Sequence, residues 1–114
     1  MRKEVYMGKF QLQANETLIG FGMMAYEYHR SITRAPTRGT IYVTTQRVCY
    51  YESWSGIVYI DLSLSEIKGY NAKRLLFITY VYIYDKNNKC YTFSGFPAKK
   101  LQIWLKQIGI RKLS

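Results

Sequence analysis

The residues that could carry out chemistry are few and lie far apart in the sequence. The one histidine, His29, has no nucleophile and acid arranged near it, and the carboxylates Asp61, Glu66 and Asp85 fall at predicted turns or strand ends. Nucleophilic and acid–base catalysis both need such groups within hydrogen-bonding reach of one another. We therefore predict a protein that binds rather than an enzyme.

The two cysteines, Cys49 and Cys90, together with one histidine, offer no zinc-ligand spacing, so no metal and no other cofactor is expected. The segment Met1–Glu16 is broken by charged residues and does not read as a signal peptide. No apolar run approaches the roughly 18 residues of a membrane span. We expect a cytoplasmic protein with reduced thiols, whose contact with a membrane would be peripheral.

One glycine motif matches a nucleotide-binding fingerprint in its spacing but not in its surrounding sequence. Residues 20–25 (GFGMMA) have the spacing of a dinucleotide loop, which requires a following helix and an acidic residue about 20 positions later. Here the following residues alternate as a strand does, and positions 39–44 are neutral. We predict instead that Gly20 and Gly22 permit a bend or bulge in a long strand.

The charge of the chain favours anionic partners. Seventeen Lys and Arg against seven Asp and Glu give a formal net charge of +10. Such a field attracts phospholipid head groups, nucleic acid or an acidic protein. The alternative is a domain that its like charges merely keep from associating.

The candidate ligand-binding residues are basic. Arg34 and Arg38 flank Pro36 in a predicted loop, Thr33–Gly39, and an arginine fork matches the geometry of a phosphate. Lys73 and Arg74, in a second predicted connection, are expected to add positive charge at the same rim of the fold. Arg30, which precedes the first loop, is a weaker candidate. A solvated loop with no ligand is the alternative interpretation.

Short strands must position these residues. The 114 residues predict one domain, residues 1–114, with its core between about positions 12 and 108. Turn residues separate strands that are predicted at Thr17–Ile32, Thr40–Thr44, Arg47–Glu52, Ile57–Asp61, Ile67–Tyr70, Leu75–Tyr84 and Lys89–Ser94. Connections this short exclude a parallel sheet. The predicted fold class is mainly β, an antiparallel barrel or roll of about seven strands.

One C-terminal helix is expected to cap this roll. After Pro97 the apolar spacing changes to that of a helix face, with Leu101, Trp104, Leu105 and Ile108 on one side. We expect Trp104 to fill the open mouth of the barrel. Tyr80, Tyr82 and Tyr84 share one face of a strand, either in the core or on the outer wall, where they would favour self-association.

The order of these elements resembles the GRAM and bacterial PH-like group of the pleckstrin-homology superfold. Three stretches carry the resemblance: residues 12–16 (LQANE), residues 39–50 (GTIYVTTQRVCY), similar to the Gly-x-hydrophobic-Tyr-hydrophobic-Thr-x-x-Arg hairpin of that family, and residues 91–96 (YTFSGF) before the helix with Trp104. The resemblance implies a module that docks on phosphoinositides, other anionic lipids or proteins without chemistry of its own.

We therefore predict a non-catalytic module that recognises an anionic phospholipid surface or a protein partner. Two other classes remain as alternatives. One is a homo-oligomeric interaction scaffold without lipid binding. The other is a single-strand nucleic-acid binder, which basic charge and exposed aromatic rings would suit but for which the RNP, KH and helix-turn-helix signatures are missing.

Overall fold

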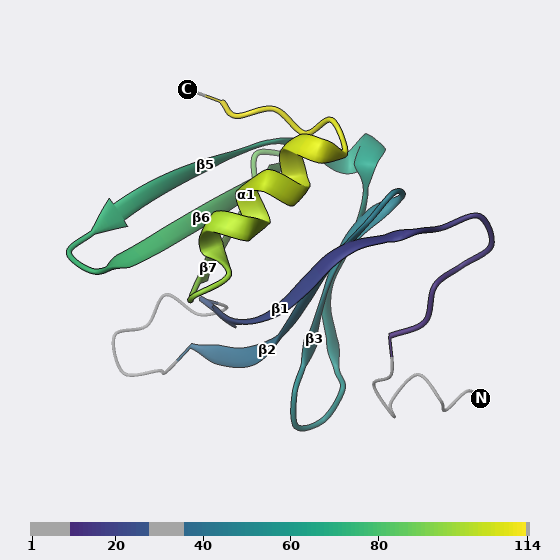
Figure 1. Cartoon of the computed structure of the whole chain (residues 1–114), viewed down its shortest axis with the longest axis horizontal. Coiled ribbons are helices and arrows are strands. Elements are labelled where there is room, and N and C mark those ends of the chain that lie inside the picture. Colours follow the sequence, from purple (N-terminus) through teal and green to yellow (C-terminus); the bar gives the residue numbers. More distant parts are fainter. Residues whose placement is uncertain (1–9, 28–35, 114) are drawn as a thin grey trace.

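Seven antiparallel strands and one C-terminal helix form the fold in the part of the chain that the computed structural model describes, residues 10–27 and 36–113 (Figure 1). The elements are β1 (Leu18–Tyr26), β2 (Thr37–Thr44), β3 (Arg47–Glu52), β4 (Val58–Ser63), a short 3-10 turn η2 (Leu64–Glu66), β5 (Ile67–Leu75), β6 (Ile78–Asp85), β7 (Cys90–Ser94) and α1 (Ala98–Gln107). The predicted fold class is confirmed. Within the described ranges, no helix has both the length and the apolar character to cross a bilayer.

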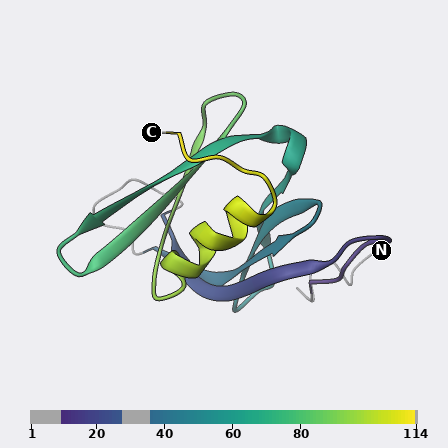
Figure 2. The ribbon, with the colours of Figure 1, turned by 45° about the horizontal axis from the view of Figure 1, so that its top comes forward.

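The strands form one bent sheet in the order β4-β3-β2-β1-β7-β6-β5. The junction between its two halves is short, because β1 pairs with β7 only through Ala25↔Ser94 and Tyr26↔Phe93. Helix α1 lies across the concave side between the two halves (Figure 2). This arrangement is a roll that one helix closes.

The β2–β3 hairpin and its turn at Thr45–Gln46 are confirmed, but several predicted strand boundaries are wrong. Strand β2 begins at Thr37, inside the predicted loop. The predicted Leu75–Tyr84 strand is interrupted, because β5 continues to Leu75 and the chain turns at Leu76–Phe77 before β6. The turn residues are apolar, so the hydrophobic pattern contains no break at the point where the chain reverses.

The helix buries its leucines more deeply than its tryptophan. Leu101 and Leu105 are fully buried in the core, and Ala98 is buried beside them. Trp104, which we expected to fill the mouth, is only half-buried and packs against the edge of this core. The helix ends as predicted, with Gly109 in the left-handed region at φ +88°.

The irregularity predicted at the two glycines of β1 occurs beside Gly20 but not at Gly22, and both glycines lie against the helix. The pairing of β1 with β2 shifts register between Leu18 and Gly20. The indole of Trp104 lies directly over Gly20, where a Cβ would come within 2.1 Å of its Cε2 atom. Gly22 faces Pro97 in the same way, at 2.8 Å. The glycines therefore give the helix a flat surface on which to lie.

Candidate functional site

One end of the roll gathers four of the chain connections. The pairs Tyr26↔Thr37, Tyr51↔Val58 and Leu75↔Ile78 close the β1–β2, β3–β4 and β5–β6 connections there, and Ser94 of β7 ends beside β1. We call this region, with residues 53–57, 75–78 and 95–97 and the strand ends beside them, the tip end. Figure 1 shows that the β5–β6 and β3–β4 hairpins splay apart, so the tip end is broad.

The most exposed large apolar side chains in the described ranges all lie at the tip end. Their exposed fractions are 94% for Trp54, 88% for Leu76, 91% for Phe77 and 105% for Phe96. The connections at the opposite end are mostly polar, with Thr45–Gln46 in one and Lys86–Asn88 in another. Because the β3–β4 and β5–β6 hairpins splay apart, these side chains form separate exposed apolar sites at one end of the roll and not one contiguous patch.

The β5–β6 turn is built from residues that a tight hairpin does not favour. Leu76 has φ +56°, and the loop between the paired Leu75 and Ile78 has two residues. Two-residue hairpins with positive φ prefer glycine, asparagine or aspartate, and a leucine there costs roughly 1 kcal/mol. The stability of the hairpin therefore does not explain why Leu76 and Phe77 occupy the turn.

The structure places three of the five predicted site residues at or near this end, and all three are exposed: Arg38, Lys73 and Arg74. Arg30 and Arg34 lie outside the described residues. The expectation that Lys73 and Arg74 belong to a connection is wrong, because both lie in β5. Arg74 donates a hydrogen bond from Nε to the Leu76 carbonyl oxygen at 3.2 Å, and so supports the turn.

Arg38 and Lys73 share one face of the sheet but do not form a clamp. Direct pairing connects them in one row across five strands, Arg38↔Ala25↔Ser94↔Tyr80↔Lys73. Four interstrand spacings separate them by roughly 19 Å along the sheet. A single phosphate cannot reach both side chains, whereas a surface with many anionic groups can.

A buried ion pair, which the sequence analysis did not predict, joins the β2–β3 hairpin to the segment before β1. Arg47 Nε donates to Glu16 Oε2 at 2.7 Å, and the Thr44 hydroxyl and the Gln13 amide also donate to this carboxylate, whose side chain is inaccessible to solvent. Burial by itself would raise the pKa of Glu16, but the hydrogen bonds from Arg47, Thr44 and Gln13 outweigh it and lower the pKa to about 2. The cluster fastens the segment before β1 to the β2–β3 hairpin, and its carboxylate has no capacity left for a ligand.

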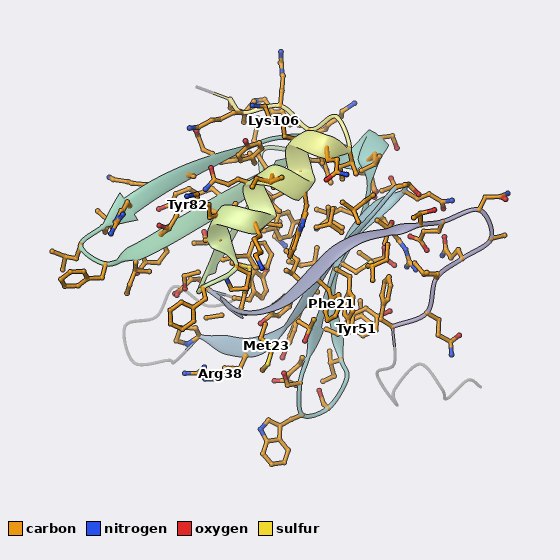
Figure 3. All side chains as sticks on the ribbon, viewed as in Figure 1. Phe21, Met23, Arg38, Tyr51, Tyr82 and Lys106 are labelled. Carbon is orange, nitrogen blue, oxygen red and sulfur yellow. The ribbon has the colours of Figure 1, made fainter. Side chains whose placement is uncertain are left out.

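A second exposed apolar surface lies on the outer wall of β1–β3. Phe10 stacks on Tyr42 at 4.1 Å between ring centroids, and Tyr51 meets Tyr42 edge-on at 5.7 Å. Phe21 and Met23 of β1 stand exposed beside them (Figure 3). We call these five side chains the outer aromatic patch; aromatic side chains and Met are enriched at protein interfaces.

The tyrosine row of β6 lies on the outer wall and not in the core. Val81 and Ile83 are buried, and the alternating Tyr80, Tyr82 and Tyr84 are half-buried on the opposite face. The rings of Tyr80 and Tyr82 stack with centroids 6.5 Å apart. Whether this row supports self-association stays a prediction.

The structure describes only some of the groups that were weighed for catalysis. His29 lies outside the described residues, and the described part of the chain brings together no three His, Cys, Asp or Glu side chains that could hold a metal. Asp85 lies at the end of β6, where it is buried and accepts hydrogen bonds from the Asn87 and Lys89 amides and the Tyr91 hydroxyl. It therefore stabilises the β6–β7 turn.

Both described cysteines are free thiols. Cys49 is buried, and Cys90 is half-buried on another strand. Burial, with the neighbouring Asp61 carboxylate, raises the pKa of the Cys49 thiol to about 12. Cys49 is accordingly protonated and inert at neutral pH.

Comparison with known proteins agrees with this architecture. The family model for the GRAM domain matches residues 4–112. Two solved structures share the fold: the Vps36 N-terminal PH domain, with TM-score 0.68, 18% identity and coverage of 89% of this chain and 85% of that chain, and the C-terminal domain of an unknown protein from Leishmania infantum, with TM-score 0.66, 15% identity and coverage of 83% and 86%. No curated protein matches the chain.

Proposed function

The chain belongs to the GRAM domain family, and from this premise we propose that it recognises an anionic membrane surface peripherally, as a non-catalytic module. GRAM and PH-like domains typically bind lipids or proteins. The observation that carries the proposal is the set of exposed basic side chains at and near the tip end, in a chain of net charge +10.

The described residues of the tip end carry a net positive charge. They include three exposed cations, Arg38, Lys73 and Arg74, against two carboxylates, Glu27 and Glu52. In the described part of the chain, neither Arg38 nor Lys73 has a carboxylate within ion-pair distance. Because Arg38 and Lys73 lie far apart on one face, a surface with many anionic head groups can contact both side chains, whereas a single head group cannot.

The test uses vesicles of neutral phosphatidylcholine and vesicles that also contain about one quarter phosphatidylserine. We expect the chain to co-sediment only with the anionic vesicles. Each basic residue near such a surface contributes about 1 kcal/mol, so Arg38→Glu with Lys73→Glu should weaken binding at least about 30-fold. The matched control is Lys106→Glu with Lys112→Glu, the same change in charge on exposed residues at and beyond the C-terminal end of α1, and Lys106 lies far from Arg38 in Figure 3.

Two outcomes would contradict the proposal. Unchanged binding after the Arg38 and Lys73 reversals would remove these residues from the site. An equal loss in the matched control would mean that the net charge of the whole chain acts, not the tip end. Repeating the assay with a phosphoinositide at two salt concentrations separates head-group recognition, which survives salt, from a diffuse field, which does not.

The outer aromatic patch supports a second candidate, self-association. Exposed Phe21 and Met23 beside Tyr42 and Tyr51 offer an apolar face to a second copy. If so, the sedimentation coefficient should rise with concentration, and Phe21→Ser should keep the chain monomeric where Ile103→Ser, an exposed change on α1, does not. A sedimentation coefficient independent of concentration would exclude this candidate.

A further inference from the structure

The β5–β6 hairpin carries its side chains in bands along its length. Four consecutive apolar residues, Leu75–Ile78, form the tip, and Leu76 and Phe77 are almost fully exposed. Directly behind them come the cations Lys73 and Arg74, and Lys73 is paired with Tyr80. From the tip backwards the order is apolar, then cationic and aromatic.

This order matches the layers of a bilayer surface. Acyl chains accept apolar groups, anionic head groups accept lysine and arginine, and tyrosine is favoured at the level between them. From the Arg74–Thr79 pair, just behind the tip, to the turn the hairpin advances about 7 Å, two residues at the rise of a strand. Peripheral segments sink about 5–10 Å into the boundary between head groups and acyl chains.

One backbone carbonyl at the tip already has a hydrogen-bond partner within the protein. A carbonyl without a partner is costly in an apolar medium. The Leu76 carbonyl has one, because it accepts the hydrogen bond from Arg74 Nε. One arginine therefore provides positive charge behind the tip and a hydrogen-bond partner at it.

We infer that the β5–β6 tip, residues 75–78, inserts into the outer acyl region of an anionic bilayer, with Lys73 and Arg74 at the level of the head groups. This inference rests on the proposed function and adds to it the penetrating segment. A projecting hairpin favours a deformable bilayer over a protein surface, which would need a pocket to receive it. The cations behind the tip match the negative charge of that bilayer.

The test is depth-dependent fluorescence quenching. Trp54→Phe with Phe77→Trp places an indole at the tip, and Trp54→Phe with Asn87→Trp places one at the opposite end of the roll. Both variants retain Trp104, so Trp54→Phe alone supplies the emission of that indole as the baseline. Relative to this baseline, on phosphatidylcholine–phosphatidylserine vesicles brominated at acyl positions 6 and 7, we expect a blue shift and quenching of the tip indole only. Co-sedimentation in the same samples reports recruitment separately.

A second variant addresses the contribution of the tip to binding without endangering the fold. Leu76→Asn supplies a residue that tolerates the positive φ of position 76, and this gain offsets the chain entropy that Phe77→Gly adds, so the melting temperature should change little. Binding to anionic vesicles should fall roughly 100-fold through the loss of two apolar side chains. The binding that persists at high salt should disappear in this variant, because screening does not weaken apolar contacts.

The outcomes separate the two proposals. Recruitment with quenching of the tip indole, and loss of binding in the Asn–Gly variant, support insertion. Recruitment without quenching, or with full binding by the Asn–Gly variant, overturns insertion and leaves peripheral electrostatic binding standing. Absence of recruitment to any vesicle overturns both.

Discussion

Arg47→Ala should lower the free energy of unfolding by about 3–5 kcal/mol, because it leaves the Glu16 carboxylate buried without its cation. The same change removes the hydrogen bond of the guanidinium to the Gln11 carbonyl and its position over the Phe10 ring, 5.1 Å from the ring centroid. Equilibrium unfolding in urea measures the difference. Arg111→Ala, an exposed arginine near the C-terminus, is the matched control and should change stability by less than about 0.5 kcal/mol.

The pH dependence of this effect has a definite sign. Glu16 has a pKa of about 2 in the folded chain against 4.5 for an ordinary glutamate. A lowered pKa stabilises the fold fully above the unfolded value, and this contribution is lost as the pH falls from about 4.5 towards 2. The stability gap between the wild type and Glu16→Gln should therefore narrow over that range, and a gap independent of pH would contradict the ion pair.

Gly20→Ala should destabilise the fold by about 3 kcal/mol, because the added Cβ meets three ring atoms of Trp104 at 2.1–2.6 Å. Neither the paired strand nor the leucine-anchored helix can retreat, so the indole must leave its site. The cost should nearly vanish in a Trp104→Ala background, where nothing occupies that space.

A double-mutant cycle in urea measures this coupling. Met23→Ala, an exposed position on the same strand, is the control for a change in β1 alone. Additive effects of Gly20→Ala and Trp104→Ala, or a cost below about 1 kcal/mol for the first, would show that the helix does not depend on the glycine.

The sequence predicts the architecture where local signals are strong. The β2–β3 hairpin follows from alternating β-branched and aromatic residues around Thr45–Gln46, and α1 follows from the change of spacing after Pro97. The spacing of Leu101, Trp104 and Leu105 does not rank their burial. The burial of Trp104 is set by β1, because its indole lies on the strand surface over Gly20 and does not enter the core.

The site was less accessible to sequence reasoning. Charge and loop position predict Arg38, Lys73 and Arg74 as binding residues, and this stays a prediction. The apolar run from Leu75 to Tyr84 gave no sign of the β5–β6 turn within it. The role of Glu16 was missed because its partner Arg47 lies 31 residues away. One local signal of this turn is present in the sequence: two cations are followed at once by four apolar residues, in Lys73–Ile78.

The left-handed leucine at position 76 has a consequence for how the chain can change over generations. Selection for heat resistance alone would replace this residue early, since glycine or asparagine relieves the local strain at no cost to the core. Under the proposed insertion, selection for membrane binding would retain Leu76. A laboratory lineage selected only for thermal stability should therefore lose Leu76, and with it the proposed vesicle binding. The residue at position 76 would then record which selection had acted.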